Sequence, residues 1–498
     1  MSVLKKLAGQ TAIYGISTVL TRVMNLVFTP LYTNAPAIVA DDGLGMYINL
    51  YAYVSFLNVL LTFGMETTFF RFISESKDPD KTYAQAFIWV GLAAGIFLGG
   101  VALLVAPVAG MMGYAGREPL LLTVAGVVFL DALAALPLAR LRHQERVTLF
   151  STITLTNVLV TIVLNLVLIF GAGWGVEAIF AANLAASAVR LGMALWKNTP
   201  PTLRPDLAHL RPMVEYGFFI MLAGFAGIMN ETLDRIMLPM RWPEGGVYDG
   251  AIQTGLAMTG IYGANYKIAM LISLATQAFR YAAEPFFFKT AQEKDSPETF
   301  ARVFHYFVIA SLGAFLCISS FAWEILAFDF FGLAGGYTFV GKAYWAGVKA
   351  IPVLLLAYVC SGAYINMSIW FKITKQTRFA LLFTGVGAAI TIAINYWGIP
   401  IYGYMACAWA TLICYAVMCV LVYGVGQRYY PIPYRIRRIL VYGVIFLGAW
   451  WATRQAGPSE GDWLVLGMKV LVCAGTFGGV ILAERLMPVF LPETTEAG

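Results

Sequence analysis

The chain has 498 residues, of which 60% are hydrophobic and 12% charged, with 33 Lys and Arg against 27 Asp and Glu. Soluble globular proteins carry about twice this fraction of charged residues, so the composition excludes an ordinary soluble domain. Apolar runs of about 20 residues or more, separated by short polar segments, predict an all-α integral membrane protein.

About fourteen segments are long enough to cross a hydrocarbon core of roughly 30 Å as helices. The first seven lie near residues 8–32, 43–70, 82–110, 118–141, 147–171, 175–196 and 213–239. The other seven lie near residues 256–286, 300–328, 344–371, 377–399, 402–425, 436–453 and 464–486. The connections stay below about 20 residues and leave no room for a soluble catalytic domain. We therefore expect a protein that is not an enzyme and needs no cofactor.

The distribution of basic residues predicts the orientation of these helices. Most Lys and Arg, including Lys5, Arg71, Arg140 and Arg438, fall on the cytoplasmic side if the N-terminus is inside. Both termini would then be cytoplasmic, and the net charge of +6 needs no nucleic-acid partner. The six Cys lie in apolar segments without a C-x-x-C pair, and three His are too few for a His-rich site, so no metal is expected.

Short blocks recur along the chain in the same order. Gly45-Met46-Tyr47 returns as Gly260-Ile261-Tyr262 at a shift of 215, and the Glu66 block returns at Glu284 at a shift of 218. Six helices separate the copies, an even number, so the repeats have the same membrane orientation. We predict two parallel six-helix lobes around a central cavity, residues 1–200 and 201–428, with two appended helices in 429–498. The change of shift predicts an irregularity late in the second copy, before Pro285.

Polar residues spaced three and four apart form stripes on three predicted helices. Asn25 belongs to the stripe of the first helix, Asn58 to that of the second, and Gln277 to that of the helix at 256–286. Such residues commonly hydrogen-bond between packed helices. Stripes that run the full length of three helices favour a hydrated cavity, which makes these three residues candidates for substrate binding.

Basic residues inside the spans are the other candidates for substrate binding, because each charge at mid-bilayer costs about 2.5–3.5 kcal/mol. Arg22 lies roughly 20 Å from the cytoplasmic end of its helix and on the polar stripe, so it either contacts substrate or pairs with an acid such as Asp131. Lys267 is also deep but lies off the polar stripe of its helix, so a structural role is at least as consistent with its position as substrate contact. Arg280 near the inner mouth either captures a phosphate or extends to the cytoplasm.

Acidic residues suggest gates and ion pairs. Glu66 and Glu284 occupy equivalent repeat positions near the inner helix ends, where an inner gate competes with simple solvation. Asp234 and Arg235 are adjacent near the outer end of the seventh helix, which favours mutual neutralisation over a cation site.

Several of these segments resemble a known family. The residues that carry the resemblance are Gly64 through Arg71, Leu136-Pro137-Leu138-Ala139-Arg140 with Arg142, and Asp234-Arg235-Ile236-Met237-Leu238. The chain resembles the polysaccharide transporters of the multidrug, oligosaccharidyl-lipid and polysaccharide exporter superfamily, most closely the O-antigen-type flippases. The resemblance implies that an undecaprenyl-diphosphate-linked oligosaccharide, of O-antigen or capsule type, moves from the inner to the outer leaflet of a bacterial plasma membrane by alternating access. It also implies membrane lipid, a glycan polymerase and glycosyltransferases as partners.

Three alternatives stay open. A flippase for peptidoglycan lipid precursors also uses fourteen helices and basic cavity residues. A cation-coupled multidrug extruder often carries an acid in its first helix, and none occurs here before Asp41. A membrane glycan polymerase or ligase would be an enzyme, but such enzymes usually have a large outer loop, which this chain lacks.

Overall fold

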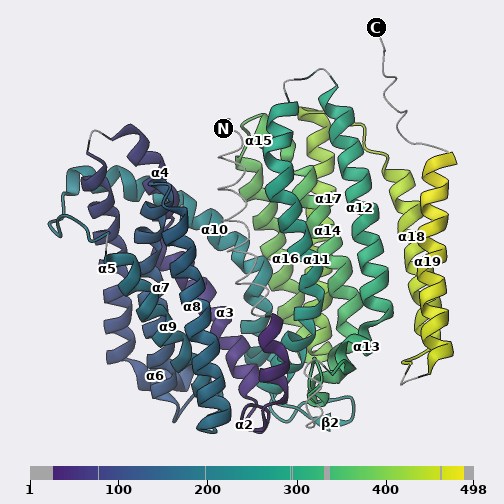
Figure 1. Cartoon of the computed structure of the whole chain (residues 1–498), viewed down its shortest axis with the longest axis horizontal. Helices are drawn as coiled ribbons and strands as arrows, with labels where there is room; N and C mark the ends of the chain where they lie inside the picture. The colour runs from purple at the N-terminus through teal and green to yellow at the C-terminus, as the bar shows by residue number, and fades with distance from the viewer. Residues whose placement is uncertain are drawn as a thin grey trace. The chain divides into compact units, whose positions relative to one another are not determined.

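The computed structural model of the chain describes residues 26–486 except 77, 197, 292, 294, 330–336, 460 and 461. Packing divides it into two compact units (Figure 1). Unit 1 takes in the described residues up to Gly263 together with Asn395–Gly403, and unit 2 takes in Ala264–Ile394 and the described residues from Tyr404 on. The two predicted lobes were defined by a repeat in the sequence, whereas the two units are defined by packing. The lobe boundaries at residues 200 and 428 therefore stay a prediction.

Unit 1 is a helical bundle with one small hairpin. A helix over residues 26–34 comes first. The elements that follow are α2 (Pro36–Val39), α3 (Gly43–Thr62), α4 (Met65–Glu75), α5 (Pro79–Leu103), α6 (Val105–Met112), α7 (Glu118–His143), α8 (Val147–Leu166) with the π-helical η1 (Val167–Gly171), α9 (Val176–Trp196) and α10 (Leu207–Arg241). The antiparallel hairpin of β1 (Val247–Tyr248) and β2 (Ala251–Ile252) precedes α11 (Gly255–Thr290), which begins in unit 1 and continues into unit 2.

Local sequence explains where these helices begin and how closely they pack. Asp78 and Asp206 cap α5 and α10, each accepting backbone N–H bonds from the first turn, and Pro79 takes the first position of α5. Small residues then allow close approach of α7 and α9, where Ala134 and Ala186 are fully buried. Ala134 belongs to an apolar cluster that also contains Ile153 of α8.

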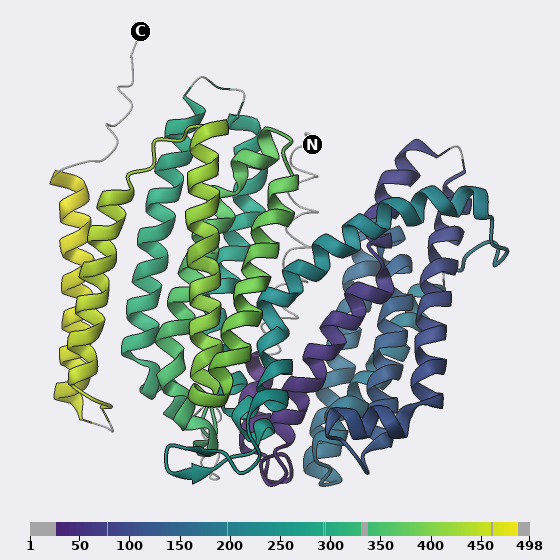
Figure 2. The same cartoon turned by 180° about the vertical axis from the view of Figure 1, so that it is seen from behind.

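Unit 2 contains the rest of the helices. They are α12 (Ser296–Ser320), α13 (Ala322–Ala327), the 3-10 helix η2 (Lys342–Ala350), α14 (Ile351–Met367), α15 (Ile369–Ile373), α16 (Arg378–Tyr402), α17 (Tyr404–Tyr429), α18 (Ile436–Gln455) and α19 (Trp463–Leu486). The last residues of α16 join unit 1. Helices α14 and α17 share a core of Ala357, Cys414 and Met418, and α18 and α19 form the yellow pair in Figure 2.

The all-α membrane fold is confirmed. Twelve helices of the described chain are long and apolar enough to span a membrane, and they match twelve of the predicted segments. Of the other two, the segment at 256–286 is covered by the 36-residue α11, and the segment at 8–32 lies mostly outside the described residues. The count of fourteen stays a prediction.

The irregularity predicted before Pro285 is wrong, because α11 runs without a break from Gly255 to Thr290. The break lies instead in the first copy of the repeat, between α3 and α4, where Phe63 and Gly64 have φ of 52° and 66°. A side chain at Gly64 would also meet α10, since an added Cβ would lie 2.7 Å from Ile220 Cβ. Glycine therefore serves two needs at this position, the left-handed backbone and the close helix contact.

Candidate functional site

Glu66 lies in an ion pair at the end of unit 1 that is predicted to be cytoplasmic. Its Oε1 is 2.7 Å from Nη2 of Arg142, near the end of α7, and both side chains are partly exposed, at 43% and 31%. The Arg142 guanidinium also lies over the Phe70 ring, 5.4 Å from its centroid. The structure thus provides Glu66 with a partner inside its own unit, and its role as a gate stays a prediction.

Two further ion pairs lie at the same end. Arg140 pairs with Asp80 at the start of α5, and its guanidinium lies 4.4 Å from the centroid of the Tyr83 ring. Lys81 Nζ is 2.5 Å from Asp206 Oδ2 in the loop before α10. The hydrogen bond from Lys81 holds the pKa of the Asp206 carboxyl below its ordinary value. These pairs join α5 to α7 and to the loop that starts α10.

The Glu66–Arg142 pair predicts a small effect of neutralisation. Because both groups are partly exposed, Glu66→Gln should lower the free energy of unfolding by less than about 1 kcal/mol, as measured by thermal unfolding in detergent. Glu66→Arg should lower the free energy of unfolding further, since two arginines would then face each other. The double variant Glu66→Arg with Arg142→Glu should restore the free energy of unfolding. Glu215→Gln, in the exposed Arg211–Glu215 pair, is the matched control. Loss of transport by Glu66→Gln at unchanged stability would instead support the gate.

Asp131, midway along α7, has partners on α9. Ser187 donates a hydrogen bond of 2.8 Å to its Oδ1, and Arg190 Nη1 lies 3.4 Å from the same oxygen. Asp131 is therefore already part of an ion pair within the described residues. Arg22, the predicted alternative partner, lies outside the described residues, as does Asn25.

Asp234 belongs to a buried hydrogen-bond network between α3, α10 and α11. It is 3% exposed, accepts a bond of 2.5 Å from the Tyr262 hydroxyl and accepts another of 2.8 Å from the backbone N–H of Arg235. Asn49 donates to the carbonyl of Arg235 and accepts from the Tyr114 hydroxyl, both at 2.8 Å. The sequence singled out Tyr262 as a repeat position but did not show that it binds Asp234.

The remaining predicted substrate-binding residues lie on α3 and α11. Asn58 on α3 of unit 1 is half-buried, and so are Lys267, Gln277 and Arg280 on α11 in unit 2. Gln277 Nε2 lies 3.5 Å from Ser273 Oγ one turn earlier. The side chain of Glu284 lies outside what the structure describes. The assignment of these residues to substrate stays a prediction.

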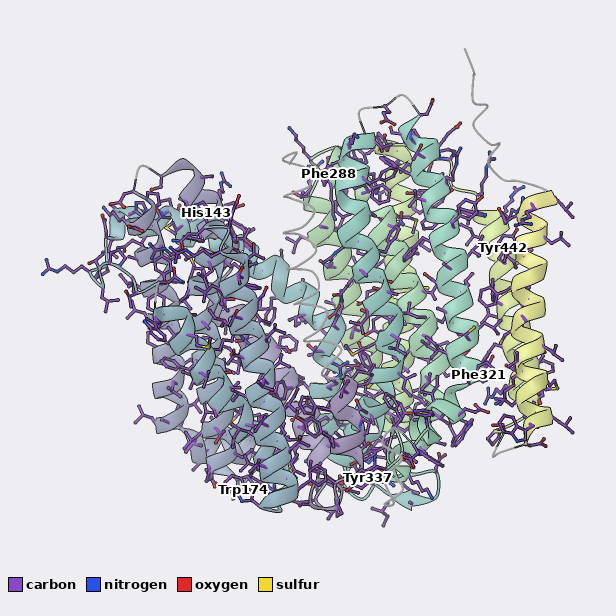
Figure 3. All side chains as sticks on the ribbon, viewed as in Figure 1. His143, Trp174, Phe288, Phe321, Tyr337 and Tyr442 are labelled. Atoms are coloured by element: carbon purple, nitrogen blue, oxygen red, sulfur yellow. The ribbon has the colours of Figure 1, made fainter. Side chains whose placement is uncertain are left out.

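Two polar clusters that the sequence did not reveal tie the α18–α19 pair to α12 and α13. At one end, Glu484 Oε1 accepts a 2.5 Å bond from Tyr442 (Figure 3) and lies 3.1 Å from Arg438 Nε and 3.2 Å from His305 Nε2. His305 is fully buried. The participants come from three helices far apart in sequence, so spacing along the chain could not predict them.

At the other end, Lys469 of α19 donates a 2.6 Å bond to Glu324 of α13, and the backbone N–H of Ser459 donates to the same oxygen at 3.1 Å. Lys469 is 2% exposed. Burial alone would raise the pKa of Glu324, but the bonds from Lys469 and the backbone outweigh it and hold the pKa below its ordinary value. The charge of Lys469 within its span thus has a structural partner.

Comparison with solved structures shows that the fold is shared with membrane transporters of known structure. A lipid II flippase MurJ in an inward closed conformation shares it with a TM-score of 0.76 at 13% identity, covering 95% of this chain and 99% of that one. An inward-facing multidrug resistance MATE family transporter shares it with a TM-score of 0.60 at 13% identity, covering 83% and 94%.

A family model adds sequence information to the fold. Residues 38–265 match the family described as polysaccharide biosynthesis protein. A sequence search of curated proteins finds no match. The family match and the shared fold together confirm the resemblance that the sequence motifs indicated.

Proposed function

We propose that the protein moves an undecaprenyl-diphosphate-linked oligosaccharide, of O-antigen or capsule type, from the inner to the outer leaflet of a bacterial plasma membrane by alternating access. The observation that carries the proposal is the match of residues 38–265 to a polysaccharide biosynthesis family in a chain that folds like a lipid flippase. The fold of a multidrug transporter over 83% of the chain supports transport rather than enzymatic chemistry.

The physical task explains the polar residues within the spans. A diphosphate and a glycan cannot cross a hydrocarbon core unless a protein replaces their hydration. Arg22 and Arg280 would bind the diphosphate, because the guanidinium group can bind phosphate oxygens in a bidentate way. Asn25, Asn58 and Gln277 would bond the glycan, and Lys267 would add positive charge or support the helix.

Transport of a peptidoglycan lipid precursor is the second candidate. The likeness to the lipid II flippase extends over nearly the full length of both chains, which favours a substrate with the same polyprenyl-diphosphate end. The two candidates differ only in the glycan that they carry.

Deletion of the gene tests the proposal and separates the candidates. We expect lipid-linked oligosaccharide to accumulate on the cytoplasmic leaflet while growth continues and the surface polysaccharide disappears. Cell lysis with accumulation of peptidoglycan precursor would favour the second candidate. Unchanged surface glycan and unchanged precursor pools would contradict both, and a glycan polymerase or glycosyltransferases that co-purify with the protein would identify its partners.

The proposed localisation, with both termini in the cytoplasm, gives a separate prediction. Reporter fusions at Gly116 and Gly457 should report the outer side, and fusions at Pro79 and Pro433 the cytoplasm, because basic residues stay on the cytoplasmic side. All four positions lie at or beyond helix ends, so a fusion there does not interrupt a span. A cytoplasmic signal from the Gly116 fusion would contradict the orientation.

A further inference from the structure

The hairpin of β1 and β2 carries an apolar pair on one face. Asp249 and Gly250 at its turn have φ of 51° and 82°. Two positive φ angles define a type I′ turn, for which Asp-Gly is a favoured sequence. This turn sets the register in which Val247 pairs with Ile252. Directly paired residues share one face of a hairpin, and here both side chains are exposed, at 61% and 75%.

The other side of the hairpin is packed, so the apolar pair is held in place. Tyr248 lies edge-on to Trp242, with ring centroids 6.2 Å apart. The indole N–H of Trp242, a buried residue, donates a 2.9 Å bond to the carbonyl of Gln253. An added Cβ at Gly246 would lie 2.7 Å from the Trp242 ring, so a larger residue would push the ring aside. These contacts fix the hairpin against its own stem.

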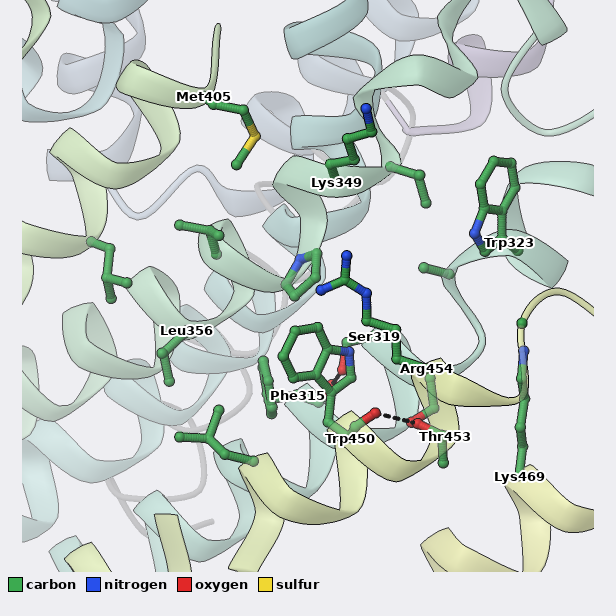
Figure 4. A pocket seen from close by; sticks show the side chains of 18 of the residues that line it. Phe315, Ser319, Trp323, Lys349, Leu356, Met405, Trp450, Thr453, Arg454 and Lys469 are labelled. Atoms are coloured by element: carbon green, nitrogen blue, oxygen red, sulfur yellow. Dashed lines mark hydrogen bonds between the residues drawn. The ribbon is translucent and has the colours of Figure 1, made fainter. Parts of the chain in front are cut away.

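The last residues of α16, which belong to unit 1, mark the level of the membrane surface. α16 is long and apolar enough to span a membrane, and Trp397 and Tyr402 near its end are exposed. Exposed Trp and Tyr at the end of a span gather at the level of lipid headgroups. In unit 2, Trp323 and Trp450 also lie at helix ends that are predicted to be outside, where they line a cavity (Figure 4). We therefore assign residues 396–402 to the headgroup level of the outer leaflet.

The hairpin lies at the same level as this end of α16. Gly403 follows Tyr402, and an added Cβ at Gly403 would lie 3.1 Å from Cδ2 of Tyr248. Arg241, just before the hairpin, donates a 3.3 Å bond to the carbonyl of Tyr396. All these residues belong to unit 1. The apolar pair of the hairpin and the exposed aromatic residues of α16 therefore share one depth in the membrane.

We propose that the hairpin is a membrane anchor, with Val247 and Ile252 inserted among the phospholipid headgroups of the outer leaflet. Exposed apolar surface marks a contact with either a membrane or a protein, and the depth shared with Trp397 and Tyr402 favours the membrane. Apolar side chains inserted in this way hold a segment at the boundary between headgroups and acyl chains. The anchor fixes the connection between α10 and α11 to the membrane surface.

Quenching of a fluorescent label on the hairpin tests the proposal. The full-length chain with Ile252→Cys is labelled with an NBD maleimide and reconstituted into phosphatidylcholine vesicles, with or without a lipid that carries a nitroxide near its headgroup. We expect the nitroxide to quench this label at least about twofold more than the same label at Glu244→Cys. Glu244 is an exposed charged residue of the same connection, so it marks a position open to water. Wild type labelled in the same way corrects for the six native cysteines.

Variants of the paired residue show whether the apolar face makes the contact. Val247→Asp, added to Ile252→Cys, should reduce quenching by the nitroxide lipid to the level of the Glu244→Cys label. Val247→Leu keeps the face apolar and should leave quenching unchanged, and thermal unfolding checks that each variant is folded. Equal quenching at Ile252 and Glu244 would overturn the proposal, because the hairpin would then lie in water with its apolar pair open to a protein partner. Full quenching in the Val247→Asp variant would overturn it as well.

Discussion

Lys469→Ala should lower the free energy of unfolding by about 3 kcal/mol, the largest stability change that we expect from a single substitution. Lys469 is 2% exposed and lies 2.6 Å from Glu324, whose side chain is 20% exposed. Removing the lysine leaves a partly buried carboxylate without its cation, and that loss costs more than the pair itself contributes. Thermal unfolding of the purified protein in detergent measures the change.

The design of this experiment separates the ion pair from the loss of side-chain volume. Lys469→Met with Glu324→Gln removes both charges and keeps the volume, so it should be more stable than Lys469→Ala. Lys342→Ala, an exposed lysine at the start of η2, is the matched control and should have no measurable effect. A double variant no more stable than Lys469→Ala would show that packing, not charge, holds α19 to α13.

The same pair gives a pH dependence with a defined sign. The folded pKa of Glu324 is below its ordinary value, so its contribution to stability is present above the ordinary pKa and is lost as pH falls through the lowered one. The stability difference between wild type and Glu324→Gln should therefore shrink in acid. A difference that grows in acid would contradict the pairing.

Arg22→Ala should reduce glycan export at least about tenfold with protein levels intact, the largest functional change that we expect. An arginine at the depth predicted for Arg22 needs a hydrated cavity or an anionic partner, because an unpaired charge in the span is costly. A diphosphate can provide that partner, and each charge-assisted hydrogen bond contributes about 1.5–3 kcal/mol. Surface glycan and lipid-linked oligosaccharide, measured in a deletion strain that carries the variant, give the result.

Two control variants define the role of Arg22. Arg22→Lys should recover only part of export, since lysine cannot reproduce the planar bidentate contact. Arg280→Ala should be milder, because Arg280 is predicted to lie nearer the inner mouth. Normal export by Arg22→Ala would contradict the proposal, and loss of the protein from the membrane would indicate a structural ion pair instead.

Hydropathy predicted the spans because a helix that crosses hydrocarbon satisfies its backbone polar groups internally and needs only apolar side chains outside. Both conditions are met within one continuous segment, so a long apolar run is enough to predict it. The break at Phe63 and Gly64 was not predicted, since it depends on a contact with α10 more than 150 residues along the chain. Nothing in the local sequence distinguishes Phe63 from other phenylalanines of the spans.

Charged residues were predictable only in part for the same reason. The sequence named Asp131 as an acid with which Arg22 could pair, and the structure pairs it with Arg190. Lys469 was visible as a charge inside a span, but Glu324 lies 145 residues away. Periodicity describes one helix at a time, whereas an ion pair between helices depends on how they pack.

The contact between Gly64 and α10 has a consequence for how the sequence can change. An added Cβ at Gly64 would lie 2.9 Å from the carbonyl oxygen of Gly217, and one at Gly217 would lie 2.8 Å from the carbonyl oxygen of Phe63. Backbone thus meets backbone on both sides, and backbone cannot adopt another rotamer to make room. An ion pair such as Glu66–Arg142 can exchange its two residues and keep its chemistry. At this helix contact no second substitution can make room for a methyl group, so we expect both Gly64 and Gly217 to tolerate no other residue.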